Sequence, residues 1–164
     1  MNTGVIGGAD GPTAVFVAGE LGDYFNVFGL IIMLIIMVPN IIFAIEFKKE
    51  KNKCKNKVMN ILEQIGRYAC MILMIFCIGM RKFEFGSIEE FVIYFLGNIA
   101  LLLIYVVIWI LFFIKQKPWK SMALAIVPTA IFLLSGITLR HTELIIAAVI
   151  FGVAHIYVTY KNRE

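Results

Sequence analysis

The chain has 164 residues, of which 61% are hydrophobic and 16% charged, and its formal net charge is +4. Soluble domains hold roughly 45–50% apolar residues, and the mean hydropathy of +0.90 is far above their range. This composition excludes an ordinary soluble protein. The basic balance does not require a nucleic-acid partner, since lysines beside a membrane span are attracted to anionic lipid.

A glycine-rich segment, residues 1–23, precedes the first long apolar run. Its centre reads Gly7-Gly8-Ala9-Asp10-Gly11-Pro12-Thr13, a carboxylate between glycines and a proline. Proline suits the first turn of a helix, and a helix from there to residue 18 would measure about 10 Å, too short to cross a bilayer. The pattern predicts either a broken hairpin or half-helix that enters the membrane, or a flexible outer tail with a simple turn.

If this segment is buried, it can form a cation site. The Asp10 carboxylate and the backbone carbonyls of Gly7 and Gly8 would supply hard oxygen ligands, suited to a small cation or a proton. We therefore name Asp10, Gly7, Gly8 and Thr13 as candidate ion-binding residues.

Five apolar runs follow, each near the roughly 20 residues that a helix needs to cross a bilayer. They cover residues 24–47, 65–80, 91–114, 122–139 and 144–160. The expected fold is an all-α integral membrane protein, a single domain with a five-helix bundle over 24–160 and a tail over 161–164.

Positive charge concentrates in alternate connections. The first connection holds Lys48, Lys49, Lys51, Lys53, Lys55 and Lys57, the third holds Lys115, Lys117 and Lys120, and the tail adds Lys161 and Arg163. Basic loops stay in the cytoplasm. We expect a multi-pass protein of the plasma (inner) membrane with its N-terminus outside and its C-terminus inside, and anionic lipid at the first of these lysine groups.

Polar side chains inside the spans are costly and should face protein. Asn40 and Asn98 are more readily explained as hydrogen bonds between helices than as substrate contacts, although a polar relay through them and His155 stays open. His155 could relay protons, or simply bond to a neighbouring helix. Glu63 and Arg67, four residues apart, predict an ion pair on one helix face.

Two small residues, Ala148 and Gly152, lie four apart in the last run. This spacing predicts a face where two helices approach closely. We find no HExxH motif, no Ser/His/Asp set and no Cys/His cluster in the sequence. We therefore expect neither an enzyme nor a bound cofactor other than a sodium ion.

Residues 4–16, Gly-Val-Ile-Gly-Gly-Ala-Asp-Gly-Pro-Thr-Ala-Val-Phe, closely resemble a signature of the beta subunit of sodium-translocating decarboxylases, the oxaloacetate and glutaconyl-CoA type. In that family the segment belongs to a broken membrane region, and its aspartate is implicated in carrying sodium. The rest of the chain shows no counterpart of that family's other ion-site motifs. The resemblance implies a cation contact at Asp10, without implying a complete pump.

Together these features predict a small bacterial inner-membrane protein that binds sodium or a proton through Asp10. It would act as a minimal or accessory transport subunit, as a homo-oligomer or with a membrane partner. The alternative is a non-catalytic scaffold or regulatory membrane subunit, in which the N-terminal hairpin serves packing alone.

Overall fold

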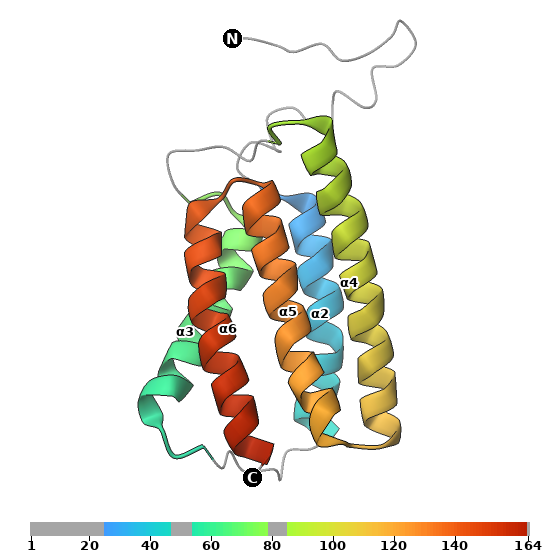
Figure 1. Cartoon of the computed structure of the whole chain (residues 1–164), viewed down its shortest axis with the longest axis vertical. Helices are drawn as coiled ribbons and strands as arrows, with labels where there is room; N and C mark the ends of the chain where they lie inside the picture. Colours follow the sequence, from blue (N-terminus) through green and yellow to red (C-terminus); the bar gives the residue numbers. More distant parts are fainter. Residues whose placement is uncertain (1–24, 47–53, 79–84, 164) are drawn as a thin grey trace, which may run out of the picture.

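The computed structural model describes residues 25–46, 54–78 and 85–163. These residues form five α-helices, labelled as in Figure 1: α2 Val27–Glu46, α3 Lys57–Ile75, α4 Ile88–Ile114, α5 Pro118–Thr138 and α6 Thr142–Arg163. All five are long and apolar enough to cross a membrane, as the sequence predicted. The predicted N-terminal hairpin lies outside the described residues.

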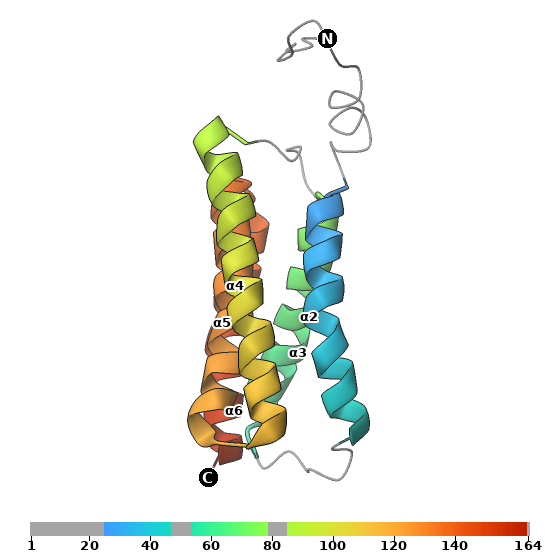
Figure 2. The same cartoon turned by 90° about the vertical axis from the view of Figure 1, so that its right-hand side faces the viewer.

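The helices run alternately up and down and pack in a ring (Figures 1 and 2). Helix α2 contacts α3 and α4, α4 contacts α5, α5 contacts α6, and α6 contacts α3, which closes the ring. Buried residues make up 56% of the apolar stretch of α5, against 22% in α2. Helix α5 is therefore the most enclosed of the five.

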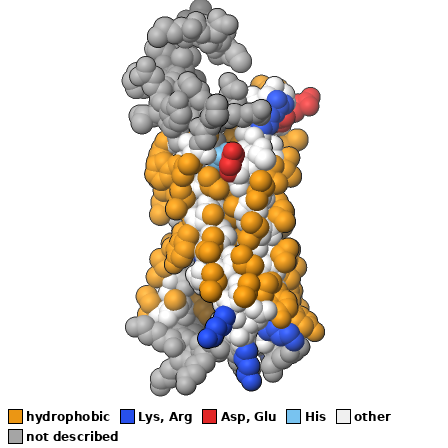
Figure 3. Space-filling view, turned by 90° about the vertical axis from the view of Figure 1, so that its left-hand side faces the viewer, with side chains coloured by type: hydrophobic (Ala, Val, Ile, Leu, Met, Phe, Trp, Pro, Cys, Tyr) orange, Lys and Arg blue, Asp and Glu red, His pale blue; other side chains and the backbone are white. Residues whose placement is uncertain are grey.

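Apolar side chains also cover the outside of the bundle. Figure 3 shows them across the middle of the molecule, with Lys and Arg side chains at its lower end. Leu34, Leu103 and Val153, for example, are each 58–63% exposed. An exposed apolar surface of this size would be unfavourable in water. The described lysines and arginines at this end belong to the start of α3, the α4–α5 turn and the end of α6, and we call it the lysine-rich end.

Side chains cap several helix ends. The Oδ1 atom of Asn56 accepts hydrogen bonds from the backbone N–H groups of Val58 and Met59, at 3.1 and 3.2 Å, and so begins α3. At the lysine-rich end, Nζ of the buried Lys120 donates to the carbonyls of Leu111 and Lys115, at 2.5 and 2.9 Å. The lysine of α5 thus caps the C-terminus of α4. It bonds to the Lys115 carbonyl and adds a second donor to the Leu111 carbonyl, which already accepts from the Lys115 N–H at 3.1 Å.

The turn between α5 and α6 is a Schellman motif. The N–H of His141 donates to the carbonyl of Gly136 at 2.8 Å, and that of Arg140 donates to Ile137 at 3.1 Å. Arg140 has a φ of 52°, a left-handed conformation usually taken by glycine. Its side chain forms an ion pair with Glu90 of α4 at 2.8 Å, a contact that glycine at this position could not make.

The predicted second span, 65–80, is wrong at both ends, because α3 covers Lys57–Ile75. The hydropathy count missed its first two turns, where Glu63 and Gln64 interrupt the apolar residues. At the other end the helix stops because the chain turns extended at Phe76, where the Ile75 carbonyl accepts a hydrogen bond from Asn26 at 2.8 Å. The start of α2 is thereby tied to the end of α3.

The predicted small-residue face on α6 is confirmed as a close contact with α5. Ala148 is fully buried, and a Cβ added to Gly152 would lie 2.4 Å from Cγ2 of Thr129. Glycine is thus required there by the approach of the two helices.

We expect Gly152→Leu to lower the melting temperature in detergent by several degrees, since overpacking costs about 1–3 kcal/mol. Val149→Leu is the matched control, because Val149 is 50% exposed on the same helix. Thermal unfolding of both variants measures the difference, and equal tolerance of the two changes would contradict the contact.

Candidate functional site

Glu63, Arg67 and His155 form a polar cluster inside the bundle, which we call the Glu63 cluster. One carboxylate oxygen of Glu63 accepts a hydrogen bond from Arg67 Nη2 and lies 2.9 Å from His155 Nδ1. Glu63 is 6% exposed. An ionised carboxylate can only accept, so a hydrogen bond to an ionised Glu63 requires the hydrogen on Nδ1 of His155.

Close packing of α3 against α6 brings the cluster together. Gly66 lies against the backbone of Phe151, where an added Cβ would be 2.8 Å from Cα of Phe151. His155, one turn further along α6, stacks on the Phe151 ring with centroids 4.8 Å apart. The missing side chain at Gly66 therefore lets α6 come near enough for His155 to reach Glu63.

The cluster lies within the length of α3 and α6 and not at their ends. Glu63 is six residues into α3 from Lys57, and His155 is eight residues before Arg163. At 1.5 Å per residue these positions are about 9 and 12 Å from the lysine-rich end. Ionisable side chains at such depth in an apolar bundle commonly mark ion or proton pathways.

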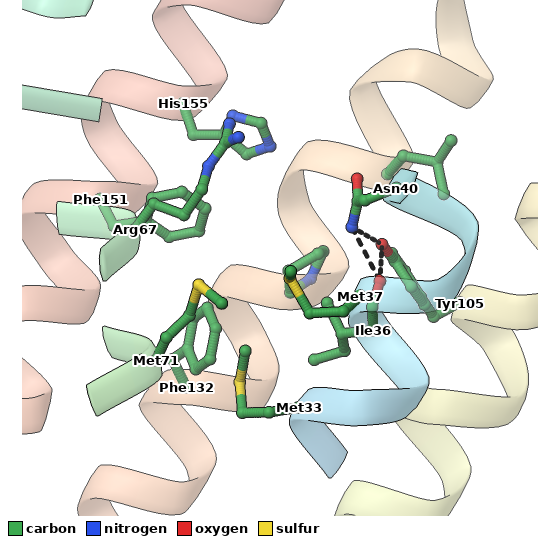
Figure 4. Close-up of a pocket in the computed structure, with 12 residues that line it drawn as sticks. Met33, Ile36, Met37, Asn40, Arg67, Met71, Tyr105, Phe132, Phe151 and His155 are labelled. Carbon is green, nitrogen blue, oxygen red and sulfur yellow. Dashed lines mark hydrogen bonds between the residues drawn. The ribbon is translucent and has the colours of Figure 1, made fainter. Parts of the chain in front are cut away.

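A second polar pair faces the cluster across the bundle. Asn40 of α2 donates from Nδ2 to the Tyr105 hydroxyl of α4 and to the Ile36 carbonyl, both at 2.8 Å. Figure 4 shows Arg67 and His155 on one wall of a small cavity and Asn40 with Tyr105 on the other. This cavity has a volume of about 80 Å³.

A larger cavity of about 780 Å³ adjoins it, and we call this the vestibule. The two share Asn40, Arg67, Leu124 and His155 in their walls. All five helices line the vestibule, and its outer residues include Lys117 and Arg163 at the ends of helices. It therefore opens at the lysine-rich end and reaches inward to the Glu63 cluster.

Towards the opposite end, polar side chains serve packing. Asn98, 2% exposed, accepts from the Ser135 hydroxyl of α5 at 3.3 Å and donates to the Tyr94 carbonyl at 2.8 Å. Asn26 donates to the Tyr94 hydroxyl at 3.0 Å. Hydrogen bonds between helices hold this part of the bundle, which lies towards the end opposite to the lysine-rich end.

The turn at that end carries a buried histidine, His141, which is 5% exposed. Burial lowers its pKa, although the Glu143 carboxylate, 3.5 Å from Nε2, and a contact with the Leu73 backbone oppose this effect. The lowered pKa favours the neutral ring. His141 is thus a structural part of the α5–α6 turn.

The outcome differs from one predicted site residue to the next. Asp10, Gly7, Gly8 and Thr13 lie outside the described residues. Asn40 and Asn98 each bond to a neighbouring helix, as expected for structural contacts, and the Glu63–Arg67 ion pair is confirmed. His155 also bonds to a neighbouring helix, but Glu63 was not predicted as its partner.

The predicted relay consists of Asn40, Asn98 and His155, and the hydrogen bonds described above do not join these three side chains into one chain. Asn98 lies with Ser135 and Tyr94, whereas Asn40 and His155 line the same two cavities. Within the described part of the chain, no group of three or more His, Cys, Asp or Glu residues could hold a metal ion.

Comparison with protein-family models, curated proteins and solved structures finds no match to this chain.

Proposed function

We propose that this chain is a small integral membrane protein that binds a monovalent cation, sodium or a proton, as a minimal or accessory transport subunit. The observation that carries the proposal is the Gly7–Thr13 segment with Asp10 at its centre, joined to a bundle of five apolar helices. Segments broken by glycine and proline next to a membrane bundle are a recurrent way to build ion sites. The N-terminal resemblance to a sodium-translocating subunit supports sodium at Asp10.

The Glu63 cluster supports a proton as a second cargo or coupling ion. A buried carboxylate bonded to a histidine provides two groups that can exchange a proton across α3 and α6. The vestibule gives this pair a route to one side of the bundle. By the lysine bias that side is the cytoplasm, so protons would reach Glu63 and His155 from inside the cell.

The test of the proposal is a sodium-dependent stability. If Asp10 is a cation ligand, sodium should raise the melting temperature of the purified protein, because binding to the folded state contributes RT ln(1 + [Na⁺]/Kd). At a hundred times Kd this is about 2.7 kcal/mol, or several degrees for a chain of this size. Choline at equal ionic strength should give no such shift.

Asp10→Asn keeps the shape of the side chain but removes its charge, so it should abolish the sodium effect. Glu20→Gln is the matched control, since it removes a neighbouring carboxylate outside the signature segment. A sodium response that survives Asp10→Asn, or a wild type that responds equally to sodium and choline, would reject the cation site. The segment would then be a packing hairpin, as in a scaffold or regulatory subunit.

A further inference from the structure

The charged side chains that line the vestibule have no role in the proposed cation site at Asp10. Its described walls carry three cationic side chains, Arg67, Lys117 and Arg163, and one carboxylate, Glu63. That carboxylate already binds Arg67 and His155. The remaining field in the vestibule is therefore positive, and apolar walls of low dielectric concentrate such a field.

The cations surround the space at two depths. Arg67 lies at the inner end, where its ion pair with Glu63 engages one nitrogen of a group with five N–H donors. Lys117, just before α5, and Arg163, at the end of α6, stand at the mouth. An anion that enters from the lysine-rich end would meet two cations first and a guanidinium further in.

Neutral donors and an apolar wall complete the lining. Gln64, Gln116, Ser121 and Thr159 supply amide and hydroxyl groups, and Trp109 and Phe112 supply apolar surface. Cavities of roughly 300–1,000 Å³ with a few converging polar groups are typical small-molecule sites. The vestibule, at about 780 Å³, is within this range.

We propose that the vestibule binds a phosphate-bearing anion. A guanidinium offers paired N–H groups that match phosphate oxygens, and lysine binds phosphate as a point charge. The phosphate can come from a small soluble molecule or from the headgroup of an anionic lipid. This site does not involve Asp10, so it stands or falls separately from the proposal of a cation at Asp10.

The experiment measures thermal unfolding of the purified protein in a maltoside detergent, with choline as the sole added cation. Inorganic phosphate is titrated against chloride at equal ionic strength. In a second arm, phosphatidylglycerol in the micelle replaces phosphatidylcholine. Stabilisation by inorganic phosphate identifies a soluble phosphate group, and stabilisation by phosphatidylglycerol alone identifies a lipid headgroup.

The site variant is Lys117→Gln/Arg163→Gln, and the matched control is Lys115→Gln/Lys161→Gln, which removes two cations of the same end that do not line the vestibule. All four residues lie at helix ends, and the melting temperature without ligand checks that both variants fold. We expect the site variant to bind the stabilising anion about tenfold more weakly, about 1.4 kcal/mol, and the control to bind it like the wild type. Equal weakening in both variants, or no stabilisation of the wild type by either ligand, would overturn the proposal.

Discussion

Gly66→Ala is expected to lower the melting temperature by several degrees and to separate α3 from α6. The added Cβ would lie 2.8 Å from Cα and 2.9 Å from the backbone nitrogen of Phe151. A backbone inside a packed helix pair cannot move aside as a side-chain tip can, so the change should cost at least about 3 kcal/mol, the upper end of the usual range for overpacking. This loss would exceed the roughly 1 kcal/mol that alanine gains over glycine in a helix.

Gly97→Ala is the matched control for this prediction. A Cβ at Gly97 would meet Cδ2 of Leu134, the end of a flexible side chain that can turn away. Its melting temperature should stay the same or rise, because the helix propensity of alanine is then gained at little steric cost. Thermal unfolding in detergent measures both variants. A Gly66→Ala protein as stable as the wild type would mean that the two helices do not approach as described.

Arg67→Gln is expected to destabilise the protein strongly. The change leaves the buried Glu63 carboxylate with His155 as its remaining described partner. Removing one member of a buried ion pair costs about 3–5 kcal/mol, and we expect about 3 kcal/mol because the Arg67 side chain is 39% exposed.

Two variants test this explanation. Arg67→Gln/His155→Gln removes both described partners of Glu63 and should be less stable than Arg67→Gln, because the remaining hydrogen bond is also lost. Lys57→Gln removes an exposed cation at the start of the same helix and should change stability little. Thermal unfolding in detergent measures all three variants. An Arg67→Gln protein as stable as the wild type would show that the ion pair does not compensate the buried Glu63 carboxylate.

The sequence was sufficient to predict five apolar helices, because each run is long enough on its own to specify a span. It was insufficient for the start of α3, where Glu63 and Gln64 lowered the hydropathy of two helical turns. Hydropathy measures how apolar a window is, and not which way each side chain faces. A polar residue that points into the bundle therefore counts against a span that it belongs to.

The Glu63 cluster was predictable in part. The spacing of Glu63 and Arg67 within one helix was enough to predict their ion pair, because i and i+4 side chains are neighbours. The contact with His155 joins residues 92 positions apart, and no local pattern encodes the rotation of α6 against α3. The one available signal was Gly66, a glycine in the middle of a span that marks a close helix contact.

The separation of these contacts along the chain also orders their formation. Lys120 reaches carbonyls five and nine residues away, so the α4–α5 hairpin can close as soon as both helices are made. Glu63 must wait for His155, in the last helix of the chain. Until α6 is in place, the Glu63 carboxylate has Arg67 alone, and the vestibule lacks one of its walls. The C-terminal helix therefore completes the site, and a chain that ends before Thr142 would contain four of the five described helices but no Glu63–His155 pair.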